Sequence, residues 1–347
     1  MNRLPQHERF VVTDQVAVRD ALARMNQLEH QFLIVVDQRG HVVGTLTDGD
    51  VRRALVHGVS VEDPVRRAMR SDPVVGVVGD DSGNHARLAE LPRALAFLPV
   101  ADSAGLLREI LVARNTDRSF RHALIMAGGE GRRLGERTRT VPKPLLPVAG
   151  VPMLEHIVRG LEAAGVLEVY VSVHYLANQI EGFAASRQGA ARMVILREEE
   201  PLGTAGSLAL LPPQHEPILV VNGDVLTKID FVAMGAFHRE HGYDGTIAVT
   251  TYQVDVPFGV IQHDDRGMFT GMDEKPTMRF FVAAGIHLLS PAFMSLVPAG
   301  RRVDMPELLH IGREAGLRLG VFPIHEYWTD IGRPDDFAAA DNREDLG

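Results

Sequence analysis

The sequence predicts a mixed α/β protein in which a Rossmann-like, mostly parallel sheet follows a smaller α/β domain. In the larger part, strand-like apolar runs alternate with helical segments such as 153–164; the runs lie at 123–126, 168–173, 193–196, 218–221 and 246–251. This alternation favours a parallel sheet with ligands at the carboxyl ends of its strands. An internal repeat occupies the smaller part. The polar stretch 115–121 indicates a linker, so we predict domains at 1–118 and 119–347.

Length and composition restrict the class of protein. A chain of 347 residues suggests about two domains. The absence of cysteine excludes disulfides, zinc–thiolate sites and thiol catalysis. A net charge of −9 argues against nonspecific binding to nucleic acid, although it does not disfavour a small anionic ligand. The sequence shows no signal core and no apolar run of membrane-spanning length, so we expect a cytoplasmic protein without a membrane partner.

The first 120 residues contain a diverged repeat with a period of 65 residues. Residues 32–40 match residues 97–105, so that Asp37 corresponds to Asp102. Each copy predicts a strand, an Asp-x-x-Gly turn and a second strand, at 42–46 in the first copy and 106–111 in the second. Apolar residues at helical spacing precede the first copy. Two copies indicate a pair of modules and not an extended solenoid.

A glycine-rich turn with nearby cations follows the apolar run 123–126. The turn and its cations are Ala127, Gly128, Gly129, Gly131, Arg132, Arg133 and Lys143. Glycines let backbone N–H groups approach an anion, and the N-terminus of a following helix would add its dipole. Three cations favour a polyphosphate. The spacing excludes a dinucleotide fingerprint, because Leu134 stands where the third glycine is required, and it excludes a Walker A loop. Taken alone, the loop also fits a strand-to-helix turn without a ligand.

Residues 127–134 and 142–144 resemble the signature of the sugar-1-phosphate nucleotidyltransferases. Arg132 stands where that family usually has threonine, which leaves Arg133 at the position of the family's arginine. Further segments match in the family's order; they are 199–206, 220–224, 257–260, 273–276 and 327–332. Ala283 departs from the family, which often has asparagine there, and this departure affects the identity of the sugar more than the reaction type.

The resemblance implies a role for each candidate residue. Arg133 would stabilise the departing β- and γ-phosphates, Lys143 the α-phosphate region and Lys275 the sugar phosphate. Asp224 and Asp330 would bind Mg²⁺, a hard cation that suits a triphosphate. The nucleotide would also contact Ala127, Gly128, Gly129, Gly131, Arg132, Gly203 and Thr204, and the sugar would contact Gly259, Glu274 and Gly285. Each motif has a simpler alternative: Thr204 as a helix cap, Asp224 in an ordinary turn, and residues 273–275 as a solvated charge cluster.

The implied reaction converts an NTP and a sugar 1-phosphate into an NDP-sugar and pyrophosphate. Residues 142–150 and 201–206 most resemble the guanylyltransferase members, so we expect GTP as the donor. Together with the N-terminal repeat, they resemble glucosamine-1-phosphate guanylyltransferases of legionaminic acid synthesis. Uridylyl or thymidylyl transfer is the near alternative, and a catalytically silent nucleotide-sugar or adenylate sensor is the alternative from another class. We expect a homo-oligomer.

The N-terminal repeat resembles a tandem pair of cystathionine-β-synthase-type (CBS) modules. Thr47, Asp48 and Asp50 in the first copy lie close to that family's adenosine-nucleotide segment, and the second copy lacks it. The resemblance implies one regulatory adenylate site per chain, with Asp48 accepting hydrogen bonds from the ribose hydroxyls. The alternative is that Asp48 and Asp50 cap a helix that begins near Val51.

Overall fold

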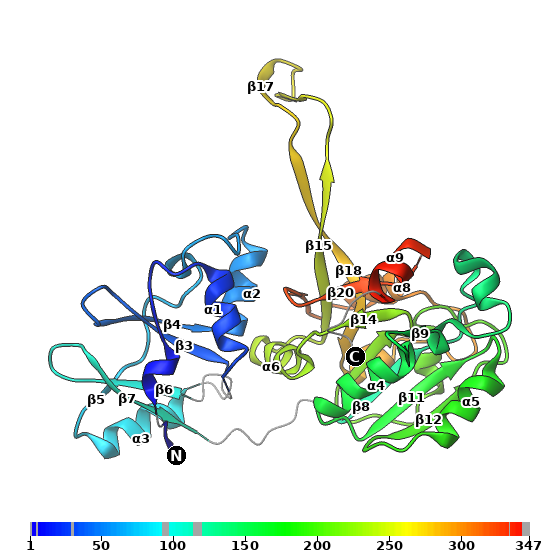
Figure 1. Cartoon of the computed structure of the whole chain (residues 1–347), viewed down its shortest axis with the longest axis horizontal. Helices are drawn as coiled ribbons and strands as arrows, with labels where there is room; N and C mark the ends of the chain where they lie inside the picture. Colours follow the sequence, from blue (N-terminus) through cyan, green and yellow to red (C-terminus); the bar gives the residue numbers. More distant parts are fainter. Residues whose placement is uncertain are drawn as a thin grey trace. The chain divides into compact units, whose positions relative to one another are not determined.

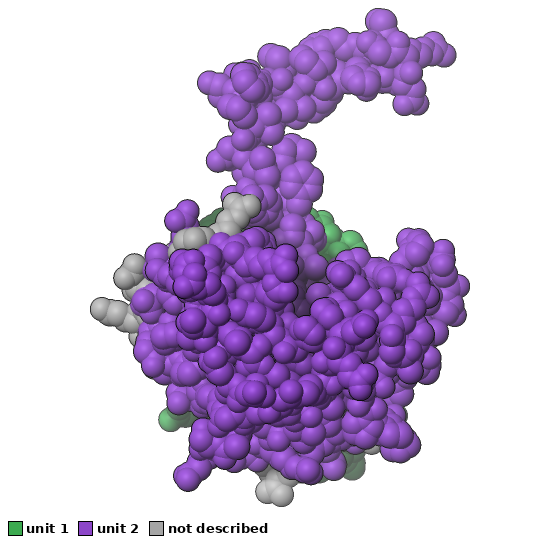
Figure 2. All heavy atoms as spheres, turned by 90° about the vertical axis from the view of Figure 1, so that its right-hand side faces the viewer, with its two compact units in different colours: residues 1–120, 231–243 green, residues 121–230, 244–347 purple. Residues whose placement is uncertain are grey.

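The computed structural model describes residues 2–4, 6–28, 31–91, 97–113, 120–332 and 334–341. The chain divides into two compact units, residues 1–120 with 231–243 and residues 121–230 with 244–347 (Figures 1 and 2). The predicted boundary between residues 118 and 119, and most of the predicted linker, lie outside the described residues. Within the described ranges, no helix is both long and apolar enough to cross a membrane.

The first unit contains the two copies of the repeat, which share one strand topology. The first copy consists of β2 (Val11–Thr13), α1 (Val18–Met25), β3 (Phe32–Val36) and β4 (Val42–Thr47), followed by α2 (Asp48–Val56). The second consists of β5 (Gly76–Val77), α3 (Asp81–Glu90), β6 (Phe97–Ala101) and β7 (Leu107–Val112). In both copies the first strand is parallel to the second, and the second is antiparallel to the third. The short strand β1 (Asn2–Arg3) pairs with β7, and the 3₁₀ turns η1 (His7–Phe10) and η2 (Val65–Arg67) complete this unit.

The repeat predicted from the sequence is confirmed at the level of single contacts. Both hairpins contain a register shift at equivalent positions. Asp37 accepts hydrogen bonds from the backbone N–H groups of residues 39 and 41, and Asp102 accepts them from residues 104 and 106. The equivalent rings of Phe32 and Phe97 stack on each other, with centroids 3.8 Å apart. The two copies therefore pack against each other through corresponding residues.

A seven-stranded sheet forms the centre of the second unit. Its order is β12 (Arg192–Arg197), β11 (Glu168–Val173), β8 (His122–Met126), β13 (Ile218–Asn222), β18 (Thr277–Leu289), β15 (Gly245–Asp255) and β19 (Leu319–Pro323). Only the pairings of β18 with its two neighbours are antiparallel, and all others in this sheet are parallel. The prediction of a mostly parallel sheet is confirmed, and β8 lies near its middle, as an apolar run buried on both faces requires.

The remaining elements of the chain surround this sheet or extend from it. The helices are α4 (Met153–Ala163), α5 (Ala177–Ser186), α7 (Pro291–Met294), α8 (Met305–Glu314) and α9 (Pro334–Asp341), and α6 (Phe231–His241) groups with the first unit. The short strands are β9 (Pro147–Val148) paired with β10 (Val151–Pro152), β14 (Val225–Thr227) paired with β20 (Trp328–Asp330), and β16 (Val260–His263) paired with β17 (Phe269–Asp273). The 3₁₀ turns are η4 (Arg132–Thr138), η5 (Lys143–Leu145) and η6 (Gly206–Leu210).

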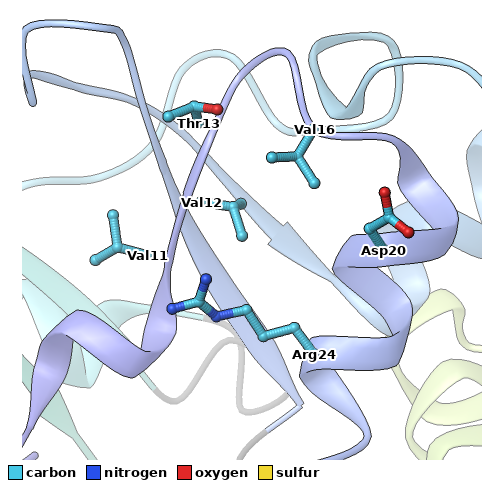
Figure 3. Close-up of a pocket in the computed structure, with 6 residues that line it drawn as sticks. All are labelled: Val11, Val12, Thr13, Val16, Asp20 and Arg24. Carbon is cyan, nitrogen blue, oxygen red and sulfur yellow. The ribbon is translucent and has the colours of Figure 1, made fainter.

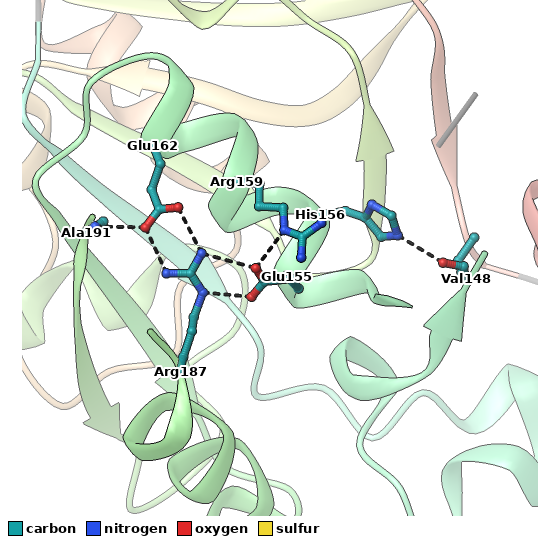
Figure 4. A network of polar contacts seen from close by, with 7 residues as sticks. All are labelled: Val148, Glu155, His156, Arg159, Glu162, Arg187 and Ala191. Carbon is teal, nitrogen blue, oxygen red and sulfur yellow. Dashed lines mark hydrogen bonds and ion pairs between the residues drawn. The ribbon is translucent and has the colours of Figure 1, made fainter. Parts of the chain in front are cut away.

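Helix α4 is amphipathic and is fixed to α5 by a buried ion-pair network. Its apolar side chains at 153, 154, 157, 158 and 161 are buried, which is the spacing of one helical face. Arg187, which follows α5, places its guanidinium between the carboxylates of Glu155 and Glu162 of α4 (Figure 4). Only 6% of the Arg187 side chain is exposed. The Arg187 guanidinium lowers the pKa of Glu162 to about 2.

Strands β15 and β18 continue beyond the sheet as a two-stranded arm, which we define as residues 250–282. Figure 1 shows the arm leaving the second unit and ending in β16 and β17, and Figure 2 shows it standing clear of that unit's body. A bulge lies at its base, where Ile247 pairs with His287 but Val249 pairs with Ala283. The sequence prediction ended the strand at residue 251, whereas β15 extends to Asp255.

The helix predicted after the glycine loop differs from the structure. The glycine loop is followed by the 3₁₀ segment η4, which is interrupted at Gly135 with φ of 62°, and not by a continuous α-helix. Residues 206–210 also form a 3₁₀ helix. Short 3₁₀ turns sum few peptide dipoles, so the expected helix dipole contributes little at the loop. An anion at this loop would therefore have to be held by backbone N–H groups and side-chain cations.

Candidate active site

The glycine loop lies at the carboxyl end of β8 and is fixed by backbone hydrogen bonds to both neighbouring strands. Ala127 N–H donates to the carbonyl of Ser172 at 2.9 Å, and Gly223 N–H donates to the carbonyl of Met126 at 2.9 Å. Gly131 has a φ of 65°, and a Cβ there would lie 3.0 Å from a Thr138 methyl group and 3.1 Å from the Lys143 Cβ, which is tight packing. The left-handed backbone conformation therefore favours glycine at this position, and the close neighbours add to that preference.

A pocket of about 410 Å³ opens over this loop and brings most of the predicted nucleotide-site residues together. The predicted residues that line it are Ala127, Gly128, Gly129, Gly131, Arg132, Arg133, Lys143, Gly203, Thr204 and Asp224. Strands β8 and β13 and the loops that follow them supply most of these residues. This is the edge of a parallel sheet at which ligands bind in α/β folds.

Lys143, Arg133 and Asp224 line the pocket, and Asp330, which does not line it, lies close enough to interact with all three charges. The Nζ of Lys143 is 2.6 Å from an Asp224 carboxylate oxygen, and only 9% of the Lys143 side chain is exposed. Strands β14 and β20 pair so that Val225 lies opposite Asp330, and Ile331 N–H donates to the Asp224 carbonyl at 3.0 Å. The antiparallel pairing thus places the two aspartates, which are 106 residues apart in the sequence, in one cluster.

The charges in this cluster influence one another. Desolvation, and then the negative charge of Asp224, raise the pKa of Asp330 above its ordinary value, while Lys143 and Arg133 act in the opposite direction. In the described part of the chain, Arg133 makes no hydrogen bond or ion pair, whereas Arg132 is ion-paired with Glu130. Arg133 is therefore the loop arginine that is available to a ligand phosphate.

The loop at 203–204 has a structural role that the sequence prediction did not include. Gly203 has a φ of 78°, and a Cβ there would meet the Val303 carbonyl and the Asp304 carboxylate at 2.6 Å. Thr204 does not cap the short helix η6; its hydroxyl accepts a hydrogen bond from the N–H of Met305, the first residue of α8. The space left by the missing Gly203 side chain is filled by the protein, although both residues still line the pocket.

The structure adds residues that the sequence prediction missed. Glu198 is buried in the pocket wall, where it accepts hydrogen bonds from the Ser172 hydroxyl and, at 2.8 Å, from the N–H of Leu202. Asn222, Arg302 and Asp304 also line the pocket. Glu198 follows an apolar strand, so the strand-end argument that selected Asp224 could have selected it as well. Arg302 follows no such pattern, because it comes from the loop before α8.

The predicted sugar-site residues are not brought to this pocket. Glu274 and Lys275 are exposed on the arm, Gly259 lies beside Glu274 there, and none of residues 250–282 lines the pocket. Gly285, at the base of the arm, is different: a Cβ there would be 2.7 Å from the side-chain amide nitrogen of Asn222, which is a pocket residue. Within one chain, the structure therefore brings together the residues predicted to bind the nucleotide, and it does not bring Gly259, Glu274 and Lys275 to the same pocket.

The predicted adenylate segment forms a capping box in the first unit. Thr47 is the N-cap of α2: its hydroxyl oxygen accepts from the N–H of Asp50, and the Asp50 carboxylate accepts from the N–H of Thr47. Helix α2 begins at Asp48, three residues earlier than expected, and the capping residue is Thr47 and not Asp48 or Asp50. The Asp48 carboxylate instead accepts from Nε of the buried Arg52 at 2.6 Å.

A separate pocket in the first unit does not include this segment. It lies between β2 and α1 and is lined by Val11, Val12, Thr13, Val16, Asp20 and Arg24 (Figure 3). The Arg24 guanidinium donates to the backbone carbonyls of residues 8 and 9, so its hydrogen-bonding groups are directed to the chain itself. This pocket is mostly apolar and offers little for a phosphate.

Comparison with known proteins agrees with this geometry. The nucleotidyl transferase family model matches residues 122–345, and the CBS domain model matches residues 3–57, which is the first copy of the repeat. The mannose-1-phosphate guanylyltransferase catalytic subunit beta of Danio rerio is 36% identical over 226 residues, and the mannose-1-phosphate guanyltransferase of Schizosaccharomyces pombe is 33% identical over 225 residues. Each alignment covers 62% of this chain, and the chain spans 62% of the length of these curated relatives.

Solved structures support the fold. HddC from Yersinia pseudotuberculosis has a TM-score of 0.50 and 24% identity, covering 64% of this chain and 98% of that one. A putative glucose-1-phosphate thymidylyltransferase from Bacillus anthracis has a TM-score of 0.50 and 21% identity, covering 64% of this chain and 96% of that one. The matched family model spans more than half of the chain and includes every residue that lines the pocket over the glycine loop. The chain therefore belongs to the nucleotidyl transferase family and carries a CBS domain in its first unit.

Proposed function

We propose that this protein transfers a guanylyl group from GTP to a sugar 1-phosphate and releases pyrophosphate. The observation that carries the proposal is the charged cluster in which Lys143 contacts Asp224 at 2.6 Å beside Asp330 and Arg133. A glycine loop, two cations and two carboxylates at one sheet edge suit a triphosphate with a bound divalent cation. The names of the curated relatives favour guanine as the base.

In the proposed reaction, an oxygen of the sugar phosphate forms a bond to the α-phosphorus of GTP. The bond from the α-phosphorus to the bridging oxygen of the β-phosphate breaks, and pyrophosphate leaves with the electron pair. Such displacements depend on positioning and charge stabilisation, and no covalent intermediate with the protein is needed. Backbone N–H groups of the loop and Arg133 would hold the leaving β- and γ-phosphates, and Lys143 would exchange its contact with Asp224 for the α-phosphate.

The carboxylate pair fits Mg²⁺. Asp224 and Asp330 offer hard oxygen donors, and the described residues hold no group of three or more ligating side chains. Phosphate oxygens and water would therefore have to complete the coordination of an octahedral cation. The raised pKa of Asp330 reflects in part the charge of Asp224, a repulsion that a divalent cation would relieve. When bound, Mg²⁺ would neutralise negative charge on the triphosphate.

Two sugar 1-phosphates are candidates for the acceptor. The sequence resemblance favours glucosamine 1-phosphate and a role in legionaminic acid synthesis, while the relatives are named for mannose 1-phosphate. Pyrophosphate release should be measured with GTP, UTP, dTTP and ATP, each combined with glucosamine, mannose and glucose 1-phosphates. We expect release with GTP and one of these sugars, and loss of release in Asp224→Ala. Absence of release from every pair would contradict the proposed activity.

The first unit would supply regulation. We propose that an adenosine nucleotide binds once per chain near Thr47 and Asp48, because the CBS model matches the first copy and the second copy lacks the Thr-Asp segment. The capping box and a ligand site can coexist, since backbone N–H groups at the start of α2 can still face an anion. An effect on catalysis requires different affinity for the active and inactive states, so titration of the turnover rate with AMP would test it.

A further inference from the structure

The paired strands of the arm hold a group of residues at a distance from its base. Strands β15 and β18 pair without interruption from Val249 and Ala283 to Asp255 and Thr277. At a rise of about 3.3 Å per residue, this ladder carries the next segment about 20 Å from the bulge. The Thr277 hydroxyl donates to the Asp255 carboxylate at 2.6 Å, which fixes the outer end of the ladder.

The residues expected to bind the sugar gather at the corner beyond this ladder. A Cβ at Gly259 would be 3.1 Å from the carboxylate of Glu274, so the Glu274 side chain lies beside Gly259. Lys275 has a φ of 47°, a left-handed conformation that costs free energy for a residue with a side chain. The corner is closed by the N–H of Val256, which donates to the carbonyl of Pro276 at 3.0 Å. The chain thus builds a preformed sugar-side cluster away from its own phosphate pocket.

The arm also exposes more apolar surface than an isolated ribbon tolerates. Large exposed side chains on it include Tyr252, Phe258, Ile261, Phe269, Met272 and Phe280, and Phe258 is 73% exposed. A two-stranded ribbon is marginally stable alone, and a run of exposed apolar side chains marks an interaction surface. The arm therefore requires a cover, and in this structure it stands clear of the body of its own unit (Figure 2).

We propose that the arm of one copy covers the pocket of a second copy and supplies Glu274 and Lys275 to it. This inference rests on the proposed function, since it assigns the sugar side of the same site. Two observations select a second copy as the occupant. The pocket receives no residue from its own arm, and the arm carries the groups that the pocket lacks. A symmetric pair of chains would complete two sites at once.

The test uses mixed assemblies of full-length chains carrying two different affinity tags. One assembly combines an Arg133→Ala chain with a Lys275→Ala chain. If the arm acts in trans, one of its two sites has both an intact pocket and an intact arm, and activity should be about half that of the wild type. The matched assembly combines a wild-type chain with an Arg133→Ala, Lys275→Ala chain, and it should be nearly inactive. The reverse order of activities would overturn the proposal.

A second measurement does not depend on catalysis. The chain contains no cysteine, so introduced thiols are unique targets. Lys275→Cys places a thiol on the arm, and Pro201→Cys places one on the pocket rim. With a short bismaleimide, single-cysteine chains of different tags should join into a covalent dimer. A doubly substituted chain that links only within itself, or chains that never join, would overturn the arm exchange. An inactive wild type that still cross-links between chains would refute only the proposed function.

Discussion

Replacement of Arg187 tests whether the buried ion-pair network holds α4 and α5 together. Arg187→Ala removes the guanidinium that bridges Glu155 and Glu162, at distances from 2.7 to 3.3 Å (Figure 4). The carboxylate side chains are only 14% and 16% exposed, so the substitution leaves two poorly solvated negative charges close to each other. Loss of one partner from a buried ion pair costs about 3–5 kcal/mol.

The expected loss is large compared with the total stability of a domain, which is about 5–15 kcal/mol. For a domain of this size it corresponds to a fall in Tm of roughly 6–20 °C. Arg159→Ala is the matched control, because Arg159 also contacts Glu155, at 2.8 Å, but its side chain is 60% exposed. An exposed pair contributes at most about 1 kcal/mol, so the control should change the Tm little.

Thermal and guanidinium unfolding, followed by the fluorescence of the single Trp328, would report on the second unit alone. The pH dependence provides a further check. Arg187 holds the folded-state pKa of Glu162 at about 2, below its ordinary value of 4.5. This stabilisation is therefore present above about pH 4.5 and is lost as the pH falls toward 2. Arg187→Ala should abolish that acid-dependent loss. Equal effects of Arg187→Ala and Arg159→Ala would refute the reasoning.

Three further predictions concern activity and the first unit. Asp224→Ala or Asp330→Ala should lower turnover at least about a hundredfold while circular dichroism stays unchanged, and near-normal turnover with Mg²⁺ would contradict the carboxylate assignment. Lys275→Ala should mainly impair use of the sugar phosphate and Arg133→Ala use of GTP, and identical defects toward both substrates in separate titrations would contradict this division. Asp48→Ala should destabilise the first unit by roughly 1.5–3 kcal/mol in denaturant unfolding, because Asp48 accepts from a buried arginine, and it should weaken AMP binding in calorimetry about tenfold to a hundredfold.

The sheet and the phosphate side of the site were predictable from local patterns. Apolar runs bounded by turn residues identified β8, β11, β12 and β13 to within about a residue. In a parallel sheet the carboxyl ends of strands meet at one edge, so the glycine loop and Asp224 had to lie near each other. The 65-residue repeat likewise predicted a strand, a turn and a second strand in each copy, and the structure confirms both hairpins.

Other features depend on contacts that a linear pattern does not contain. Arg302 lines the pocket from the loop before α8, and no strand-end or spacing rule identifies it. The position of Glu198 after a strand could have been noted, but its hydrogen bonds to Ser172 and Leu202 could not. The separation of Lys275 from the pocket depends on how far β15 and β18 extend. Many apolar side chains on the arm are exposed, so the pattern of apolar residues does not tell where the strands leave the sheet. The order of the motifs predicted that Lys275 belongs to the site. It carried no information on whether Lys275 acts on the pocket of its own chain or on that of a second copy.

The aspartate-stabilised turn occurs in both copies of the repeat in the first unit, and this arrangement affects how such a chain can diverge. Each copy keeps the aspartate-stabilised turn, the register shift and a stacked phenylalanine, whereas only the first keeps Thr47 and Asp48. The contacts that hold the duplicated halves together are thus separate from the residues that would recognise a nucleotide. Duplication therefore permits one half to lose recognition while it continues to serve as the folding partner of the other.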